Sequence, residues 1–321
     1  MSRALVLALF CSPAAAHVAA WHKSMWCLNG TTAGVDNPNN REPGTPLYNL
    51  KFDDWWFHHV NNCDQFPPAD GDFLDLPANG HFTIEHATDR AFTSLSYNGS
   101  MAGVYIDGKD HLDGFDGAGE CITDPNIHAQ NESMAAGTAF AISYQSDLAK
   151  VTPDNLVVFS VLYNTPWRRL ATYAVPDLPA CPPGGCICAV SGICGQPNMY
   201  MLGFRCRVTG AGGQDAAGVG RYPLAAPRPA RYCREGKNAR CVRGAKQFLA
   251  WQQKEGNTAL PPVRAGAKVR GGRLRFPGYN ARMGFADGAW VWVWWLLLVF
   301  LSVAAVTCFF FSVWISLAPF I

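Results

Sequence analysis

The sequence predicts an all-β protein, folded as an antiparallel β-sandwich with long loops. Short runs rich in β-branched and aromatic residues recur along the chain. Clusters of Gly, Pro, Asn and Asp separate them, which is the pattern of strands joined by turns. No amphipathic helical pattern longer than about three turns precedes the C-terminal apolar segment. The clearest expected strands cover residues 140–144, 156–162 and 200–208.

The first 16 residues are typical of a signal peptide. Arg3 precedes an apolar run over residues 4–11, which is too short to span a bilayer, and small residues follow as far as Ala16. We therefore expect residues 1–16 to be removed as the protein enters the secretory pathway. A cut after Ala16 makes His17 the first residue of the mature protein.

Residues 17–288 are expected to form one domain. Segments 210–231 and 260–280 are rich in Gly, Ala and Pro, and we interpret them as extended segments that wrap this domain. Residues 17–200 carry 8 Lys and Arg against 20 Asp and Glu, whereas residues 201–288 carry 17 against 4. A basic segment can bind nucleic acid, but the secretion signal argues against that partner. We expect a monomer without a nucleic-acid partner.

Residues 289–321 contain no charged residue. As a helix this segment would be about 50 Å long, more than the roughly 30 Å of the hydrocarbon core requires. Two interpretations stay open: a C-terminal transmembrane helix, or a lipid-anchor signal that is later removed. The length of the segment and the lack of a polar spacer favour the helix. Either interpretation places the protein at the extracellular face of the plasma membrane or elsewhere on the cell surface.

The cysteines also indicate an oxidising compartment. Ten of the 12 cysteines lie within residues 17–288, and this even number predicts up to five disulfides. Their spacing lacks the paired C-x2-C knuckles of a zinc site. Asn29, Asn98 and Asn131 begin N-x-S/T sequons, so we expect a glycoprotein. The ten cysteines are Cys27, Cys63, Cys121, Cys181, Cys186, Cys188, Cys194, Cys206, Cys233 and Cys241.

A histidine at the mature N-terminus has an unusual capacity to bind metal. The α-amine of His17 and one of its ring nitrogens can bind the same ion, and an α-amine loses its proton far more readily than a lysine does. One further imidazole would complete a three-nitrogen site. Nitrogen ligands without thiolate suit Cu(II), so His17 points to copper.

Several long motifs resemble one protein family, the lytic polysaccharide monooxygenases of auxiliary-activity family fourteen. The resemblance starts at His17 and covers essentially all of residues 17–288. The matching motifs are HVAAWHKSM (17–25), FDDWWFH (52–58), PPADGD (67–72), ISYQSD (142–147), CPPGGCIC (181–188), YMLGFRCRVTG (200–210), CVRGAK (241–246), QKEGN (253–257) and GFADG (284–288).

This resemblance implies a copper histidine brace on an immunoglobulin/fibronectin-like sandwich. The ligands of the single copper ion fall on His17, His128 and Tyr200, and Tyr200 is the axial phenol. The implied activity is oxidative cleavage of a polysaccharide of the xylan or cellulose type, or of a cell-surface glycan. It uses an external electron donor and peroxide or oxygen. A non-catalytic copper-binding protein for copper acquisition or storage stays open as the alternative, followed by a glycan-binding adhesin.

The chain also departs from the family pattern. Cys27 and Cys63 look like additions, whereas Ala87 and Thr138 stand where family members tend to have cysteine, so we expect one disulfide to have moved.

Other candidate site residues are weaker. His58 and His59 look like metal ligands, but neighbours on a strand point to opposite faces, so we expect them to be structural. The aromatic run 55–57 is interpreted as core, and the acidic loop 107–120 as solvated.

Cleavage after Ala16 is directly testable. N-terminal sequencing of the secreted protein is expected to read His-Val-Ala-Ala from His17. A start at Ala16 or Val18 would contradict the brace, because an extra residue converts the amine of His17 into an amide and a missing one removes His17 altogether.

Overall fold

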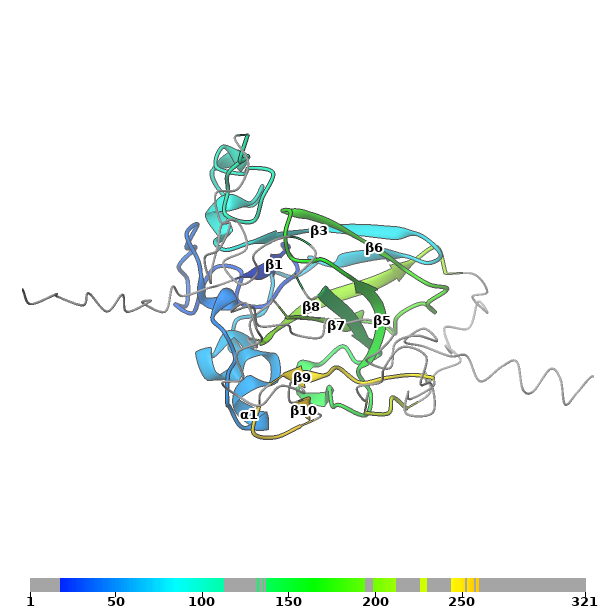
Figure 1. Cartoon of the computed structure of the whole chain (residues 1–321). Coiled ribbons are helices and arrows are strands. Elements are labelled where there is room, and N and C mark those ends of the chain that lie inside the picture. The colour runs from blue at the N-terminus through cyan, green and yellow to red at the C-terminus, as the bar shows by residue number, and fades with distance from the viewer. Residues whose placement is uncertain are drawn as a thin grey trace, which may run out of the picture.

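A computed structural model describes residues 18–112, 132, 135, 137–193, 199–211, 226–229, 244–251, 253–256 and 258–259. Within these residues the architecture is mostly β, with one short α-helix (Figure 1). The strands are β1 (Ala19–Trp21), β2 (Leu74–Pro77), β3 (His81–Ala87), β4 (Gly137–Ser143), β5 (Val157–Leu162), β6 (Leu170–Ala174), β7 (Cys186–Ile193), β8 (Met199–Thr209), β9 (Ala250–Trp251) and β10 (Thr258–Ala259). The helices are α1 (Phe52–Trp55) and the 3-10 segments η1 (Glu42–Gly44), η2 (Trp56–Asn61), η3 (Cys63–Gln65), η4 (Arg90–Phe92), η5 (Tyr97–Gly99) and η7 (Leu148–Lys150).

Two sheets make up most of the described structure. The smaller has the order β1-β3-β6 and is antiparallel, and the larger has the order β2-β8-β7-β4-β5. The three strands expected from the sequence correspond to β4, β5 and β8. The prediction of purely antiparallel pairing is wrong, because β2 runs parallel to β8 and β10 runs parallel to β9. Strands β2 and β8 are far apart in the sequence, so no hairpin pattern in the sequence indicates their parallel pairing.

The larger sheet is buried on both of its faces. One face packs against the smaller sheet through a core that includes Phe82, Phe140 and Tyr173. The opposite face packs against α1, η2 and residues 248–250, so that Trp55 and Phe57 are core residues, as expected. In Figure 1 the smaller sheet lies above the larger one, and α1, β9 and β10 lie below it.

Three disulfides connect described residues. Cys27–Cys63 joins the segment after β1 to η3, so the two cysteines that look like additions pair with each other, a connectivity that the sequence left open. Cys181–Cys186 and Cys188–Cys206 secure the β7 region, the second of them between paired strands β7 and β8. The remaining expected cysteines, Cys121, Cys194, Cys233 and Cys241, lie outside the described residues.

The predicted signal peptide (1–16) and the predicted C-terminal apolar helix (289–321) also lie outside the described residues. Within the part of the chain that the structure does describe, no helix has the length and apolarity needed to cross a membrane.

The expectation that His58 and His59 lie on a strand is wrong. Both belong to η2, where Phe57 and His58 adopt positive φ angles of 48° and 62°. The structural role expected of them fits their surroundings: His58 is buried, and exposed His59 hydrogen-bonds Asp64 at 2.8 Å.

Two buried histidines should make the protein sensitive to acid. Burial lowers the pKa of His58 and of His86 to about 4. In the unfolded chain each binds a proton as the pH falls below about 6.5, whereas in the folded chain neither does until about pH 4. The free energy of unfolding therefore has its full value above about pH 6.5. Between pH 6.5 and 4 it falls by about 1 kcal/mol per pH unit for each histidine.

Denaturant unfolding from pH 7.5 to 5 measures this loss. His86→Gln should flatten the pH dependence, because it removes one of the two protons involved. His81→Gln is the matched control, since His81 is an exposed histidine on the same strand, β3. Equal pH slopes for His86→Gln and the unmodified protein would contradict the assignment.

Candidate functional site

Tyr200 is the one predicted copper ligand that the structure describes. It lies near the start of β8, opposite Gly192 of β7, and it is only 4% exposed. Its side chain packs in a small cluster with Val18 and Ile106, separate from the main cores. Val18 directly follows His17 in the sequence. The chain next to the predicted N-terminal histidine therefore lies against the predicted axial phenol.

Strand β1 fixes the direction of this N-terminal segment. Ala19 pairs with Ala87 of β3, and Trp21 pairs with Glu85. The indole of Trp21 is almost fully buried and donates a hydrogen bond to the carbonyl of Ala87 at 2.9 Å. Pairing with β3 and the buried side chain of Trp21 hold β1 in place. Val18, the residue before β1, therefore has a fixed position at the edge of the smaller sheet.

Ile106 belongs to a loop that is also tied to the smaller sheet. Its carbonyl accepts a hydrogen bond from the backbone N–H of Thr88 at 2.8 Å, directly after β3. On the same loop, Nε2 of His111 lies within hydrogen-bond distance, 2.6 Å, of the Asp107 carboxylate, and both side chains are only slightly exposed to solvent. Nothing in the sequence singled out Ile106, since an isolated apolar residue in a polar loop carries no signal of its tertiary contacts.

His17 and His128 lie outside the described residues, so their positions stay predictions. Among the described residues, no group of three or more His, Cys, Asp or Glu side chains could hold a metal ion. The nearby His22 is engaged elsewhere: its Nδ1 lies 2.7 Å from the hydroxyl of Ser24, and burial lowers its pKa. The structure thus brings Tyr200 together with the residue next to His17, and it does not place the second imidazole.

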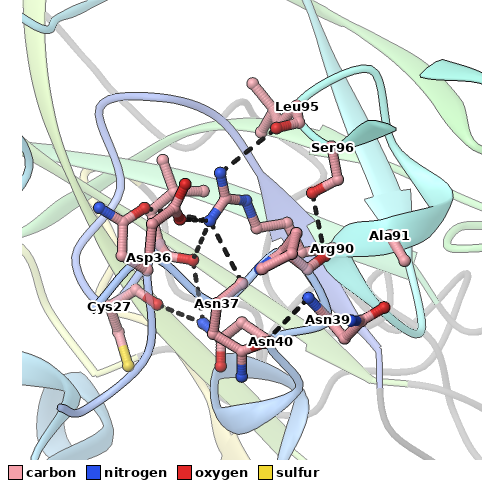
Figure 2. A network of polar contacts seen from close by, with 12 residues as sticks. Cys27, Asp36, Asn37, Asn39, Asn40, Arg90, Ala91, Leu95 and Ser96 are labelled. Atoms are coloured by element: carbon pink, nitrogen blue, oxygen red, sulfur yellow. Dashed lines mark hydrogen bonds and ion pairs between the residues drawn. The ribbon is translucent and has the colours of Figure 1, made fainter. Parts of the chain in front are cut away.

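A buried arginine secures the loops that follow β1 and β3. Arg90 is 6% exposed and lies three residues beyond Ala87, the partner of Ala19. Its guanidinium forms an ion pair with Asp36 (Figure 2). It also donates to the Asn29 side chain at 3.1 Å and to the carbonyls of Asn37 and Leu95, each at 3.3 Å.

Asn40 extends this network. Its side-chain amide donates to the carbonyl of Cys27 at 2.6 Å and of Leu28 at 3.0 Å (Figure 2). Asn40 thus ties the two ends of the 27–40 loop together, and Arg90 binds that loop to the loop of residues 89–96 by partly buried polar contacts. The sequence did not reveal the contacts between the loops, because Arg90 lies more than 50 positions from Asn29 and Asp36.

Comparison with known proteins identifies similar sequences over most of the chain. The family model described as "Lytic polysaccharide monooxygenase AA14" matches residues 1–294. A protein of Trametes coccinea, "AA14 family lytic polysaccharide monooxygenase B", is 35% identical over 296 residues, which is 88% of this chain and 64% of that protein. A protein of Talaromyces rugulosus with the same description is 32% identical over 312 residues, covering 90% of this chain and 97% of its own. The chain thus spans less than two thirds of the length of the Trametes relative.

Removal of the Arg90 guanidinium should destabilise the protein. Arg90→Met leaves the carbonyls of Asn37 and Leu95 without their donor, so we expect a loss of about 2 kcal/mol in the free energy of unfolding, measured with denaturant; Asp36 adds little, because its side chain is 62% exposed. Arg207→Met is the control, because Arg207 and its partner Asp75 are both about half exposed. It should cause no measurable change, since exposed ion pairs contribute little. Equal effects of the two substitutions would disprove the role of the network.

Proposed function

Because the chain belongs to the AA14 family of lytic polysaccharide monooxygenases, we propose that it is a copper-dependent enzyme that cleaves glycosidic bonds oxidatively. The observation that supports this most directly is that Tyr200 and Val18 belong to one small buried cluster. It brings the backbone next to His17 against the phenol that the family pattern assigns to the metal. The same membership underlies our proposal that the two packed sheets form an immunoglobulin/fibronectin-like sandwich.

The proposed copper ligands are the α-amine and imidazole of His17, the imidazole of His128 and the phenol of Tyr200. This set has nitrogen and oxygen donors without thiolate, which suits copper better than zinc or an iron–sulfur cluster. The buried position of Tyr200 beside the N-terminal segment fits such a site. When bound, copper would supply the one-electron redox chemistry needed to activate peroxide or oxygen, with electrons from an external donor.

The described residues would act by positioning. Pairing of β1 with β3 directs Val18, and therefore the residue before it, toward Tyr200. Val18 and Ile106 pack on the Tyr200 side chain and exclude water from one side of it. The Tyr200 phenol would help to hold the copper only weakly. It would influence the redox behaviour of the metal more than its affinity.

The proposed substrate is a polysaccharide of the xylan or cellulose type, or a glycan at the cell surface. The cell-surface alternative follows from the apolar segment 289–321. If this segment anchors the protein, the active site can reach only glycans within about one domain of the membrane. Membrane attachment and cell-surface localisation belong to this proposal and depend on that segment alone.

Copper binding tests the ligand set. The purified protein should bind one Cu(II) with a type-2 electron paramagnetic resonance spectrum, and His128→Ala should lose most of the affinity because one of the proposed imidazole ligands is gone. Tyr200→Phe should keep nearly all the affinity and alter the spectrum. His59→Ala is the matched control: His59 is exposed and pairs with Asp64, so its removal should leave copper binding unchanged. Unaltered affinity in His128→Ala would refute the assignment of that ligand.

A glycan screen with ascorbate and peroxide separates the enzyme from a copper store. We expect oxidised oligosaccharides, detected by mass spectrometry, only when reductant, copper-loaded protein and the susceptible glycan are all present. Transfer of Cu(I) to a competing chelator without any oxidised sugar would instead support the alternative of copper acquisition or storage.

A further inference from the structure

One buried histidine has no role in the proposed copper site. His58 is 0% exposed, and neither of its ring nitrogens has a hydrogen-bond partner of normal geometry among the described residues. Its φ angle of 62°, and that of 48° at Phe57, lie in the left-handed region, which residues other than glycine adopt uncommonly and an aromatic residue such as Phe57 more rarely than histidine. A residue that only filled space would avoid both the buried nitrogens and the strained backbone.

The position of His58 relates to an interruption along the edge of β8. At Met199 this edge is paired with Leu47, whose N–H donates to the Met199 carbonyl at 2.9 Å. At Gly203 it is paired again, where the N–H of Trp26 donates to the carbonyl at 3.0 Å. Alternate residues of a strand direct their backbone polar groups to the same edge, so those of Met201 point there too. Within the described residues, no strand pairs with Met201 on this edge of β8. Its strand partner, Ser191 of β7, lies along the opposite edge.

Segment η2 covers this interruption. It contacts β8, and the ring of Phe57 lies so close to Gly203 that a Cβ atom there would be 2.9 Å from it. The Met201 backbone lies near enough to the His58 imidazole to oppose the lowering of its pKa by burial, although neither ring nitrogen has a hydrogen-bond partner within the described part of the chain. The imidazole therefore lies beside the Met201 backbone, between the contacts made by Leu47 and Trp26.

We propose that His58 is a positioning residue for Tyr200, acting through the backbone of Met201. Its imidazole supplies the polar partner that no strand provides at this point, and so completes the edge of β8. Met201 is the residue next to Tyr200, and rigid backbone there keeps the phenol turned toward Val18 and Ile106. The inference rests on the proposed function only in so far as Tyr200 is a copper ligand.

Hydrogen–deuterium exchange of the copper-free full-length protein tests the contact with Met201. His58→Leu should speed exchange in the peptide that contains Met201 roughly tenfold, because leucine offers no polar group. His58→Asn should restore slow exchange, since asparagine tolerates the left-handed backbone and carries a donor and an acceptor. Phe57→Leu is the matched control from the same buried segment, and it should lower the melting temperature without this local change. Equal exchange in His58→Leu and Phe57→Leu would overturn the proposal.

The Cu(II) spectrum then connects the contact to Tyr200. His58→Leu should shift the spectrum in the direction of Tyr200→Phe, and His58→Asn should keep the spectrum of the unmodified protein. A wild-type spectrum in His58→Leu, in a protein where Tyr200→Phe does shift it, would overturn the positioning role and leave the proposed function intact. If Tyr200→Phe itself changed nothing, the ligand assignment would fail, and faster exchange in His58→Leu would still support the contact with Met201.

Discussion

The larger sheet is buried on both faces, and the need to pair its backbone polar groups is the constraint on which the rest of the structure depends. Strand β8 shows this most clearly. Along one edge it meets three separate pieces of chain, because no single strand follows it for its full length. Leu47 pairs at Met199, the segment 24–26 pairs at Gly203 and Arg205, and β2 pairs from Cys206 onward. These contacts bring the segments after β1 and before α1 to the strand that carries Tyr200.

The candidate site is a product of this convergence. Val18, Ile106 and Tyr200 come from the smaller sheet, a loop attached to it, and the larger sheet. Strand pairing holds Tyr200 and the residue that follows Val18, and a backbone hydrogen bond to Thr88 holds Ile106, so the packing of the two sheets fixes where the three meet. A change in that packing would therefore move the phenol relative to the N-terminal segment without altering either element. The Arg90 network adds a second restraint by binding together the loops that continue from β1 and β3.

Much of the fold could be predicted from the sequence, because strands buried on both faces leave strong local patterns. Residues 140–144, 156–162 and 200–208 proved to be β4, β5 and β8, and the pairing of Cys27 with Cys63 agrees with their joint departure from the family pattern. Three features could not be predicted, because they depend on contacts between residues that are distant in the sequence. They are the parallel pairing of β2 with β8, the helical conformation at His58 and the cluster around Ile106. Of the site, family motifs predicted Tyr200 in a buried strand; His17 and His128 remain predictions.

The Cys27–Cys63 disulfide has a further consequence for the resistance of the fold to proteolysis. Residues 32–37 form an uninterrupted exposed stretch, which makes them an accessible place for a peptide bond to be cut. The piece that carries β1 would stay covalently attached after such a cut, because Cys27 lies before the exposed stretch and Cys63 after it. On the other side of the cut, Asn40 would still hold Cys27 and Leu28 through its amide. A molecule cut within this loop can therefore keep Val18 beside Tyr200. Cleavage of one peptide bond there would leave the arrangement around the phenol unchanged.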